Sequence, residues 1–240
     1  MSCVIRARNL SFKYQSGEPA LSDLSLSVHQ HEKVGVIGPS GAGKTTFFWH
    51  LNGLLKPNSG YVEVLDRTLA EHKNIREIRR HVALTFQQVN DQLFCPSVWE
   101  EIAFGPRNLG WPKQKIQETV ERWLAYFELK EVSHRPPHHL SGGQKRSVAL
   151  AAAMAMEPQL LILDEPANDL DHRSRRRLIT YLEGLPIAIM VASHDFYLIS
   201  EVTQRCVLMN RGRIVADKPT IELIHDEDTL RQYGMEAIKM

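Results

Sequence analysis

The feature that most constrains the fold of this chain is a glycine-rich segment between an apolar run and a helical pattern. Residues 38–45 read GPSGAGKT, after the apolar residues 34–37 and before helical periodicity over 45–55. The segment fits G-x-x-x-x-G-K-[ST], and it has the strand–loop–helix context that this pattern requires. Glycines let the backbone approach an anion closely, and the N-terminus of a helix adds the positive end of its dipole. We therefore expect an α/β unit that binds the phosphates of a nucleotide.

Two side chains at the end of this segment supply the chemistry that a nucleoside triphosphate requires. The ammonium group of Lys44 is expected to reach the β- and γ-phosphates, and the hydroxyl group of Thr45 is expected to hold Mg²⁺. The alternative is an accidental glycine-rich turn, which the flanking strand and helix patterns disfavour. The residues predicted to bind ATP here are Gly38, Pro39, Ser40, Gly41, Ala42, Gly43, Lys44, Thr45 and Thr46.

A second apolar run ends in two adjacent carboxylates. Residues 160–163 read LLIL, and Asp164 and Glu165 follow them directly. In an open α/β sheet, ligands bind at the C-terminal ends of the strands. One carboxylate can hold Mg²⁺, and the other can orient and partly deprotonate an attacking water. The alternative is a pair of solvated carboxylates at a strand end, and the nearby phosphate-binding pattern weighs against it.

A third motif places glycines at the start of another helix. Residues 140–144 read LSGGQ and precede helical periodicity over 145–156, with Ser141 as a natural N-cap. Open N–H groups at such a helix tip can bind an anion. A chain with one nucleotide has no obvious use for a second such tip, so we expect it to contact a nucleotide held by another copy. An ordinary turn before a helix is the alternative. The residues of this predicted contact are Ser141, Gly142, Gly143 and Gln144.

The composition is that of an ordinary globular chain, and it excludes several classes of protein. The 240 residues are 24% charged and 43% hydrophobic, with 29 Lys and Arg against 28 Asp and Glu. Fibrous and disordered classes are therefore excluded, and near-neutral charge argues against a dedicated nucleic-acid-binding protein. No run reaches the roughly 18 apolar residues that a membrane-spanning helix needs. We expect a soluble chain that depends on other chains for any membrane process.

The order of the patterns predicts an α/β fold with a mainly parallel sheet and helices on both faces. An antiparallel β part is expected at the N-terminus, because residues 2–8 and 24–28 alternate apolar and polar side chains around a turn. Strand signals vanish between about 90 and 157, where helical periodicity dominates. We expect one domain, 1–240, whose nucleotide-binding core spans 1–87 and 158–217, with a helical subdomain at 88–157 and a short C-terminal extension at 218–240.

The three motifs, in this order, resemble those of the ATP-binding subunits of ABC transporters over about residues 4–217. That resemblance implies a P-loop NTPase (RecA-like) fold and hydrolysis of ATP with Mg²⁺. It also implies a head-to-tail dimer, with ATP sandwiched between the phosphate-binding segment of one chain and the LSGGQ segment of the other. The roles that it implies are adenine stacking by Tyr14, Mg²⁺ coordination by Thr45, Gln87 and Asp164, catalysis by Glu165, His194 and Gln87, and a D-loop role for Asp169 and Asp171.

A narrower resemblance lies around residues 86–94, FQQVNDQLF, and continues through 97–108. This stretch is similar to energy-coupling-factor transporters, especially the cobalt and nickel importers of prokaryotes. The resemblance implies a peripheral position on the cytoplasmic face of the membrane. It also implies a dimer with itself or a paralogous ATPase, together with a transmembrane coupling subunit and a substrate-binding membrane subunit. A vitamin importer and a non-transport ABC ATPase remain as alternatives. Val89 stands where proline is usual, and the D-loop reads NDLD.

Three further groups of side chains have weaker interpretations. A metal site at His134, His138 and His139 is less favoured than no site, because spacing alone does not make ligands converge. The basic run after the D-loop is expected to be a solvated helix face. Some of Phe94, Val98 and Trp99 are expected to line a groove for a short helix of the transmembrane partner. The basic run comprises Arg173, Arg175, Arg176 and Arg177.

Overall fold

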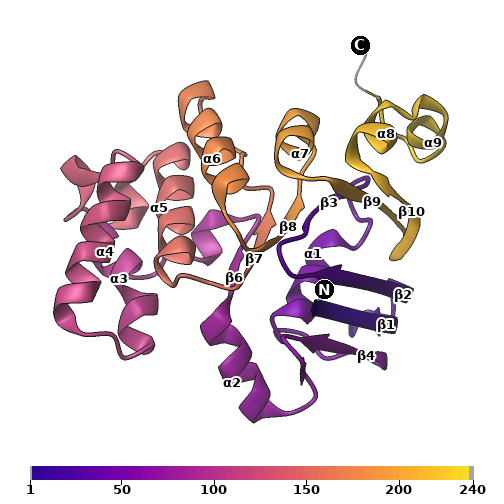
Figure 1. Ribbon diagram of the computed structural model, residues 1–240, viewed down its shortest axis with the longest axis horizontal. Coiled ribbons are helices and arrows are strands. Elements are labelled where there is room, and N and C mark those ends of the chain that lie inside the picture. The colour runs from indigo at the N-terminus through magenta and orange to yellow at the C-terminus, as the bar shows by residue number, and fades with distance from the viewer. Residues whose placement is uncertain (1, 238–240) are drawn as a thin grey trace.

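The computed structural model describes residues 2–237, which form two β-sheets surrounded by helices (Figure 1). The strands are β1 (Cys3–Lys13), β2 (Pro19–His29), β3 (Lys33–Ile37), β4 (Ser59–Val64), β5 (Arg67–Thr68), β6 (Val82–Thr85), β7 (Leu160–Asp164), β8 (Ala188–Ala192), β9 (Arg205–Asn210) and β10 (Arg213–Pro219). The helices are α1 (Lys44–Leu51), α2 (His72–His81), α3 (Val98–Asn108), α4 (Lys113–Tyr126), α5 (Gly142–Ala155), α6 (His172–Gly184), α7 (Phe196–Val202), α8 (Thr220–His225) and α9 (Glu227–Gln232). Three short 3₁₀ turns are η1 (Val89–Asp91), η2 (Lys130–Val132) and η3 (Pro137–His139).

The larger sheet has the strand order β10-β9-β3-β8-β7-β6, and all of its neighbouring strands run parallel except β9 and β10. The smaller sheet, β2-β1-β4-β5, is antiparallel. The expected α/β class, with a mainly parallel sheet and an N-terminal antiparallel part, is confirmed. Parallel strands share one C-terminal edge, so the loops after β3, β6, β7 and β8 gather on the same side of the sheet.

The parallel strands are buried on both faces, and their side chains alternate between two hydrophobic cores. In β7, Leu160 and Ile162 point into a core shared with α1 and the antiparallel sheet. Leu161 and Leu163 point the other way, into a core shared with α5, α6 and α7. This alternation is the period-two geometry of a strand, and it explains why β7 reads as a continuous apolar run. The sheet is therefore a rigid platform for the loops at its edge.

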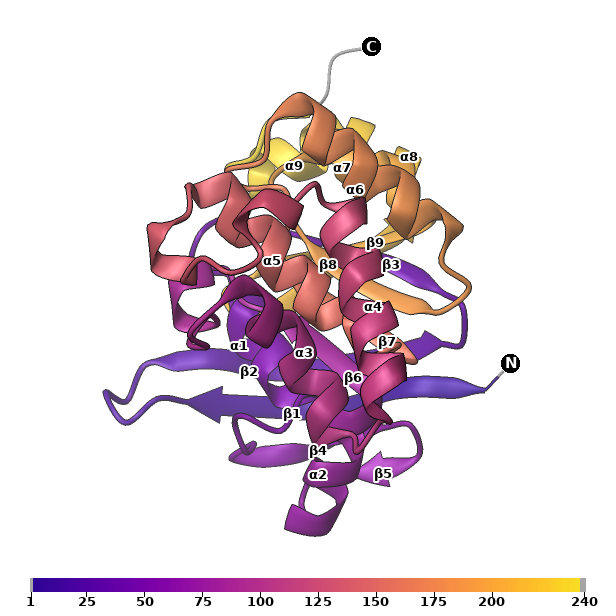
Figure 2. The ribbon, with the colours of Figure 1, turned by 90° about the vertical axis from the view of Figure 1, so that its left-hand side faces the viewer.

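Helices α3, α4 and α5 form a block at one side of the large sheet (Figures 1 and 2). Two caps define its helix starts. The hydroxyl of Ser97 accepts a hydrogen bond from the N–H of Glu100 at 3.2 Å, and Ser141 begins α5. Trp99 and Trp111 are partly buried against a hydrophobic core that includes residues of α3, α4 and α5. Glu101 is buried inside it and accepts hydrogen bonds from the N–H groups of Phe94 and Cys95.

Several boundaries differ from the sequence-based expectation. Strands β1 and β2 each span 11 residues, well beyond the alternating segments, because β-bulges interrupt the alternation. Helix α1 ends at Leu51 rather than near 55. Helix α2 was not expected. The C-terminal segment forms the short helices α8 and α9, and the part of the predicted extension over 238–240 lies outside the described residues.

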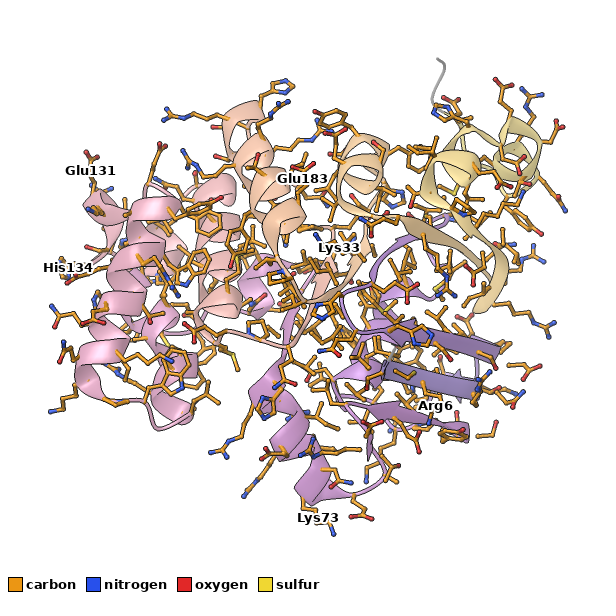
Figure 3. The ribbon with its side chains drawn as sticks, in the orientation of Figure 1. Arg6, Lys33, Lys73, Glu131, His134 and Glu183 are labelled. Atoms are coloured by element: carbon orange, nitrogen blue, oxygen red, sulfur yellow. The ribbon has the colours of Figure 1, made fainter. Side chains whose placement is uncertain are left out.

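One buried cation ties the sheet to its covering helix. Lys33, at the start of β3, is only 8% exposed. Its ammonium group donates to the carbonyl oxygens of Leu182 and Glu183 at 2.8 and 2.7 Å, at the end of α6 (Figure 3). Burial lowers the pKa of Lys33, and the nearby Glu183 opposes that shift. This contact satisfies carbonyl groups that every helix C-terminus leaves open.

Candidate functional site

The predicted nucleotide-binding residues meet in one pocket at the C-terminal edge of the parallel strands. The pocket has a volume of ≈ 350 Å³. Its walls come from the β1–β2 turn, from the β3–α1 loop and from the ends of β6, β7 and β8. The lining residues are Tyr14, Glu18, Pro19, Ala20, Ser40, Gly41, Ala42, Gly43, Lys44, Thr45, Thr46, Gln87, Asp164, Glu165 and His194. Gly38 and Pro39 complete the same loop and contribute carbonyl oxygens beneath it.

Two glycines in the β3–α1 loop occupy positions that a side chain could not. Gly43 has a φ of 99°, and a Cβ there would lie 2.6 Å from the carbonyl oxygen of Ala20. Gly38 has a φ of 149°, and a Cβ there would lie 2.2 Å from the carbonyl oxygen of Met209. The loop is therefore held against both neighbouring strands by residues without side chains. No side chain caps the N-terminus of α1 at Gly43, so its first N–H groups face the pocket without competition.

Lys44 places a buried ammonium group in this loop. Its side chain folds back and donates to the carbonyl oxygens of Gly38 at 2.6 Å and Pro39 at 3.1 Å. Burial lowers the pKa of Lys44, while the nearby Glu165 and Asp164 oppose that shift. Carbonyl oxygens are weak partners for a cation, and phosphate oxygens would be stronger ones. The position suits a group that turns toward a polyphosphate when one binds.

Thr45 and Asp164 bring a hydroxyl and a carboxylate together. The Thr45 hydroxyl donates to Asp164 Oδ2 at 2.6 Å, across from the start of α1 to the end of β7. Burial raises the pKa of Asp164, and the hydrogen bond from Thr45 partly offsets that effect. Oxygen ligands of this kind are those that Mg²⁺ prefers. The donor set therefore fits a magnesium ion next to the phosphate-binding loop.

Glu165 has one carboxylate oxygen engaged and one free of hydrogen bonds. The residue is 2% exposed and has a φ of 48°, a strained value for a residue other than glycine. Its Oε2 accepts from the Ser193 hydroxyl and the His194 N–H, both at 3.3 Å. Its Oε1 has no hydrogen-bond partner, although His194 Nε2 lies 3.3 Å away outside hydrogen-bonding geometry. A buried acceptor without a donor in a pocket is suited to a polar ligand such as water.

Tyr14 lies at the outer rim of the pocket. Its hydroxyl makes a 2.9 Å hydrogen bond with the Thr46 hydroxyl, and its ring contacts Phe12 edge-to-face, with centroids 5.0 Å apart. The side chain remains 39% exposed. The ring is thus held in place by two contacts while part of it stays available to a ligand.

The LSGGQ segment does not line this pocket. Ser141, Gly142 and Gln144 are exposed, Gly143 is half-buried and Leu140 is buried. Ser141 and Gln144 form a capping box in which each side chain accepts a hydrogen bond from the other's backbone N–H, at 3.3 and 3.1 Å. Gly143 packs so closely on the D-loop that a Cβ there would lie 2.7 Å from the carbonyl oxygen of Asp169. The sequence-predicted residues therefore form two separate groups, a pocket and an exposed helix tip.

The two D-loop aspartates have different surroundings. Asp169 has a φ of 64° and lies against the start of α5. Asp171 is the N-cap of α6 and accepts from the N–H of Ser174 at 2.7 Å. Hydrogen bonds from Ser174 lower the pKa of Asp171. Capping of α6 gives Asp171 a structural role. An aspartate directly before a helical pattern is a helix-start signal that can be read from the sequence.

Sequence reasoning missed Arg146, which lies behind the pocket in α5. It is 1% exposed, and its guanidinium group donates to the carbonyl oxygens of Phe86 and Gln87 at 2.8 and 2.7 Å. It therefore fixes the backbone on which Gln87 stands. Lys145 and Arg146 stand together before the apolar run of α5, so the sequence suggests two solvated cations and carries no signal for this contact.

The weaker interpretations fare differently. Val98 is fully buried and cannot line a groove, whereas Phe94 is 67% exposed and contacts Phe104 edge-to-face. His134 lies at the outer edge of the helical block (Figure 3). Among the side chains that the structure describes, no three of His, Cys, Asp or Glu gather as a metal site. No helix of the described part of the chain is both long and apolar enough to cross a bilayer.

Comparisons with known proteins agree with this geometry. A family model described as ABC transporter matches residues 21–168. The energy-coupling factor transporter ATP-binding protein EcfA of Methanothermobacter thermautotrophicus is 40% identical over 237 residues, which cover 97% of this chain and 76% of that protein. The cobalt import ATP-binding protein CbiO of Rhodobacter capsulatus is 40% identical over 240 residues, with 98% and 85% covered.

Solved structures show the same fold. The structure of cbiO1 from Clostridium perfringens, described as part of the ABC transporter complex cbiONQ, is 29% identical. It superposes with a TM-score of 0.80 over 97% of this chain and 94% of that one. The ATP-binding cassette MJ0796, at 24% identity, superposes with a TM-score of 0.84 over 90% of this chain and 98% of that one.

Proposed function

Because this chain belongs to the ABC transporter family of ATP-binding proteins, we propose that it hydrolyses ATP to drive an energy-coupling-factor importer that carries cobalt or nickel ions. One observation carries the proposal. Lys44, Asp164, Glu165, Gln87 and His194 come from four separate loops and line a single pocket. Such a constellation combines phosphate binding, metal binding and water activation, which together make up phosphoryl transfer to water.

The division of work within the pocket follows from the contacts. Lys44 exchanges its two carbonyl partners for the β- and γ-phosphates of ATP. Mg²⁺ would be held by Thr45, Asp164 and Gln87, and it would neutralise charge on the β- and γ-phosphates. Glu165 orients the attacking water through its free Oε1, and His194 assists at the γ-phosphate. The exposed ring of Tyr14 stacks on the adenine.

The second half of each site is supplied by another chain. The segment Ser141–Gln144 is exposed except at the half-buried Gly143 and lies outside the pocket, so it is free to contact ATP held by a partner. In a head-to-tail pair, two ATP molecules would each bridge one phosphate-binding loop and one LSGGQ tip. Hydrolysis removes the bridging charge, and the pair opens. The partner is a second copy or a paralogous ATPase.

The opening of the pair is transmitted to the membrane subunits through the helical subdomain, residues 88–157. Phe94 and Phe104 form an exposed aromatic pair beside this block, which suits contact with a short helix of a transmembrane coupling subunit. The protein would then lie on the cytoplasmic face of the membrane, with a separate membrane subunit that binds the cargo. Similarity to the cobalt import ATP-binding protein of Rhodobacter capsulatus supports cobalt over a vitamin as the cargo.

The proposal is tested by ATPase assay and by transport. The purified chain should hydrolyse ATP in the presence of Mg²⁺, and Lys44→Ala should abolish binding of a fluorescent ATP analogue. Cells that express the chain with its membrane subunits should accumulate radioactive cobalt, and Lys44→Ala should prevent this accumulation. A chain that neither binds nor hydrolyses ATP would refute the proposal, and normal ATPase activity with vitamin uptake alone would change the cargo.

A further inference from the structure

Arg146 is the largest fully buried side chain of the described residues, and nothing in the proposed reaction uses it. It lies in the second turn of α5, directly behind the exposed LSGGQ tip. Its two terminal nitrogens donate to two consecutive carbonyl oxygens, those of Phe86 at 2.8 Å and Gln87 at 2.7 Å. These residues follow β6, and they are about sixty positions away along the chain.

The arginine is held there at an energetic cost. Its Nε has no hydrogen-bond partner, and no carboxylate within residues 2–237 forms an ion pair with it. Burial lowers the pKa of Arg146, although Asp169, Asp164 and Glu165 oppose that shift through their charge. Burying a cation against neutral carbonyl groups is expensive compared with an apolar residue. Because an apolar residue would cost less to bury, stabilisation of the fold alone does not explain an arginine in this position.

The guanidinium group suits this particular task. Its planar fork presents two donors in a fixed geometry, so it can hold two neighbouring carbonyl groups at once. An ammonium group on the lysine stem is a point charge without that fork. Arg146 therefore fixes both the position and the orientation of the peptide that carries the Gln87 side chain. That side chain lines the nucleotide pocket of the same subunit.

The start of α5 contacts both the segment after Gln87 and the D-loop. Lys145 donates to Asn90 Oδ1 at 3.0 Å, in the 3₁₀ turn that follows Gln87. Gly143 packs against the carbonyl oxygen of Asp169 in the D-loop. The helix tip is thus joined to the Gln87 segment on one side and to the D-loop on the other. A displacement of the tip is transmitted to Gln87 through Arg146, because a buried bidentate contact cannot stretch freely.

We propose that Arg146 is a positioning residue that couples the two ATP sites of the dimer by fixing Gln87 to the LSGGQ tip. A nucleotide held by the partner chain presses on Ser141–Gln144, and Arg146 moves the Gln87 peptide of the same chain with it. Each chain then senses its partner's nucleotide through its own Gln87. The inference deepens the proposed function and rests on it.

The first test is a double-mutant cycle. Arg146→Lys keeps the charge and removes the fork. Lys145→Met is the matched control, because Lys145 is a half-buried neighbour whose ammonium group donates to Asn90 Oδ1 rather than to the Gln87 peptide. We expect Arg146→Lys to lower kcat about tenfold with little change in KM for ATP, and to remove cooperativity in ATP concentration. In a Gln87→Ala background, the same change should have no further effect on kcat, since its target is already lost.

Two results would overturn the inference. If the effects of Arg146→Lys and Gln87→Ala on kcat multiply, the arginine acts by another route. If Lys145→Met lowers kcat as much as Arg146→Lys, the effect belongs to the start of the helix in general. A merely structural role would lower the melting temperature without this dependence on Gln87.

Hydrogen exchange separates a failure of this inference from a failure of the proposed function. The amides of residues 86–92 should exchange faster in Arg146→Lys than in the wild-type chain, while the amides of β7 and β8 should be unchanged. This readout needs no ATPase activity. Absence of ATP hydrolysis in the wild-type chain would refute the proposed function alone, whereas unchanged exchange at 86–92 would refute the role of Arg146.

Discussion

The chain contains two glycine-rich helix starts that resemble each other in sequence and differ in structure. The start of α1 has no side-chain cap and faces the pocket that Lys44 and Asp164 line. The start of α5 is capped by Ser141 and Gln144 and lies exposed, outside the pocket. The capping box satisfies two N–H groups and leaves those of the two glycines in the first turn. The α1 tip therefore belongs to a nucleotide pocket within its own chain, whereas the α5 tip is suited to a nucleotide held by another chain.

The largest expected effect comes from substitution of Glu165, because this residue lies in the nucleotide pocket that the start of α1 faces. Glu165→Gln keeps the shape and removes the base, so kcat should fall about 10²- to 10⁴-fold. ATP should still bind, and the ATP-bound dimer should accumulate. Turnover by phosphate release and dimer content by sedimentation measure both effects together. Activity close to that of the wild-type chain would contradict the role of Glu165.

Gly143→Ala tests the start of α5 and its contact with the D-loop. Its Cβ would lie 2.7 Å from the carbonyl oxygen of Asp169, so the tip and the D-loop must move apart. We expect kcat to fall roughly tenfold and the free energy of unfolding to fall by about 1–3 kcal/mol. Binding of an ATP analogue to the separate chain should not change.

Gly142→Ala is the matched control for the stability effect, since its Cβ would meet the Asp169 Cβ at an ordinary 3.4 Å. Urea unfolding of the two variants makes the comparison. Equal stability of both variants would show that the start of α5 does not depend on its contact with the D-loop.

A smaller effect is expected from Asp164. It concerns the stability of the nucleotide-free chain, which the buried charge of this residue lowers. Burial raises the pKa of Asp164 above its usual value of 3.8, because the charged carboxylate loses solvation inside the fold. Protonated Asp164 therefore contributes to the free energy of unfolding below pH 3.8, and this contribution is lost as the pH rises through the pKa of Asp164 in the folded chain. Asp164→Asn should therefore raise the melting temperature of the nucleotide-free chain at pH 7, with little change near pH 4.

The same substitution should lower Mg²⁺-dependent hydrolysis, because a neutral amide binds the ion more weakly than a carboxylate does. Thermal unfolding at the two pH values measures the difference. A lower melting temperature for Asp164→Asn at pH 7 would mean that its hydrogen bond with Thr45 outweighs the cost of burying its charge.

The sequence predicted the pocket better than the contacts behind it, for a physical reason. The residues at 38–45 and at 164–165 form local patterns, and parallel strands bring their ends to one edge. Arg146 escaped prediction because its partners are backbone carbonyl groups, which carry no residue signature. Val98 was misplaced because periodicity in α3 does not tell which of two apolar faces meets solvent. Strands β1 and β2 exceed the predicted strands because bulges break the alternation that marks a strand.

Disulfide cross-linking between chains tests most directly the claim that each site is built from two subunits. One chain would carry Ser40→Cys beside the phosphate-binding loop, the other would carry Gln144→Cys, and both would carry Cys3→Ser and Cys95→Ser to remove the two partly exposed thiols. With ATP and Glu165→Gln in both chains, we predict a covalent dimer of the mixed proteins that Lys44→Ala in the first chain prevents. Efficient cross-linking of Ser40→Cys chains to each other, with no mixed product, would contradict the head-to-tail arrangement.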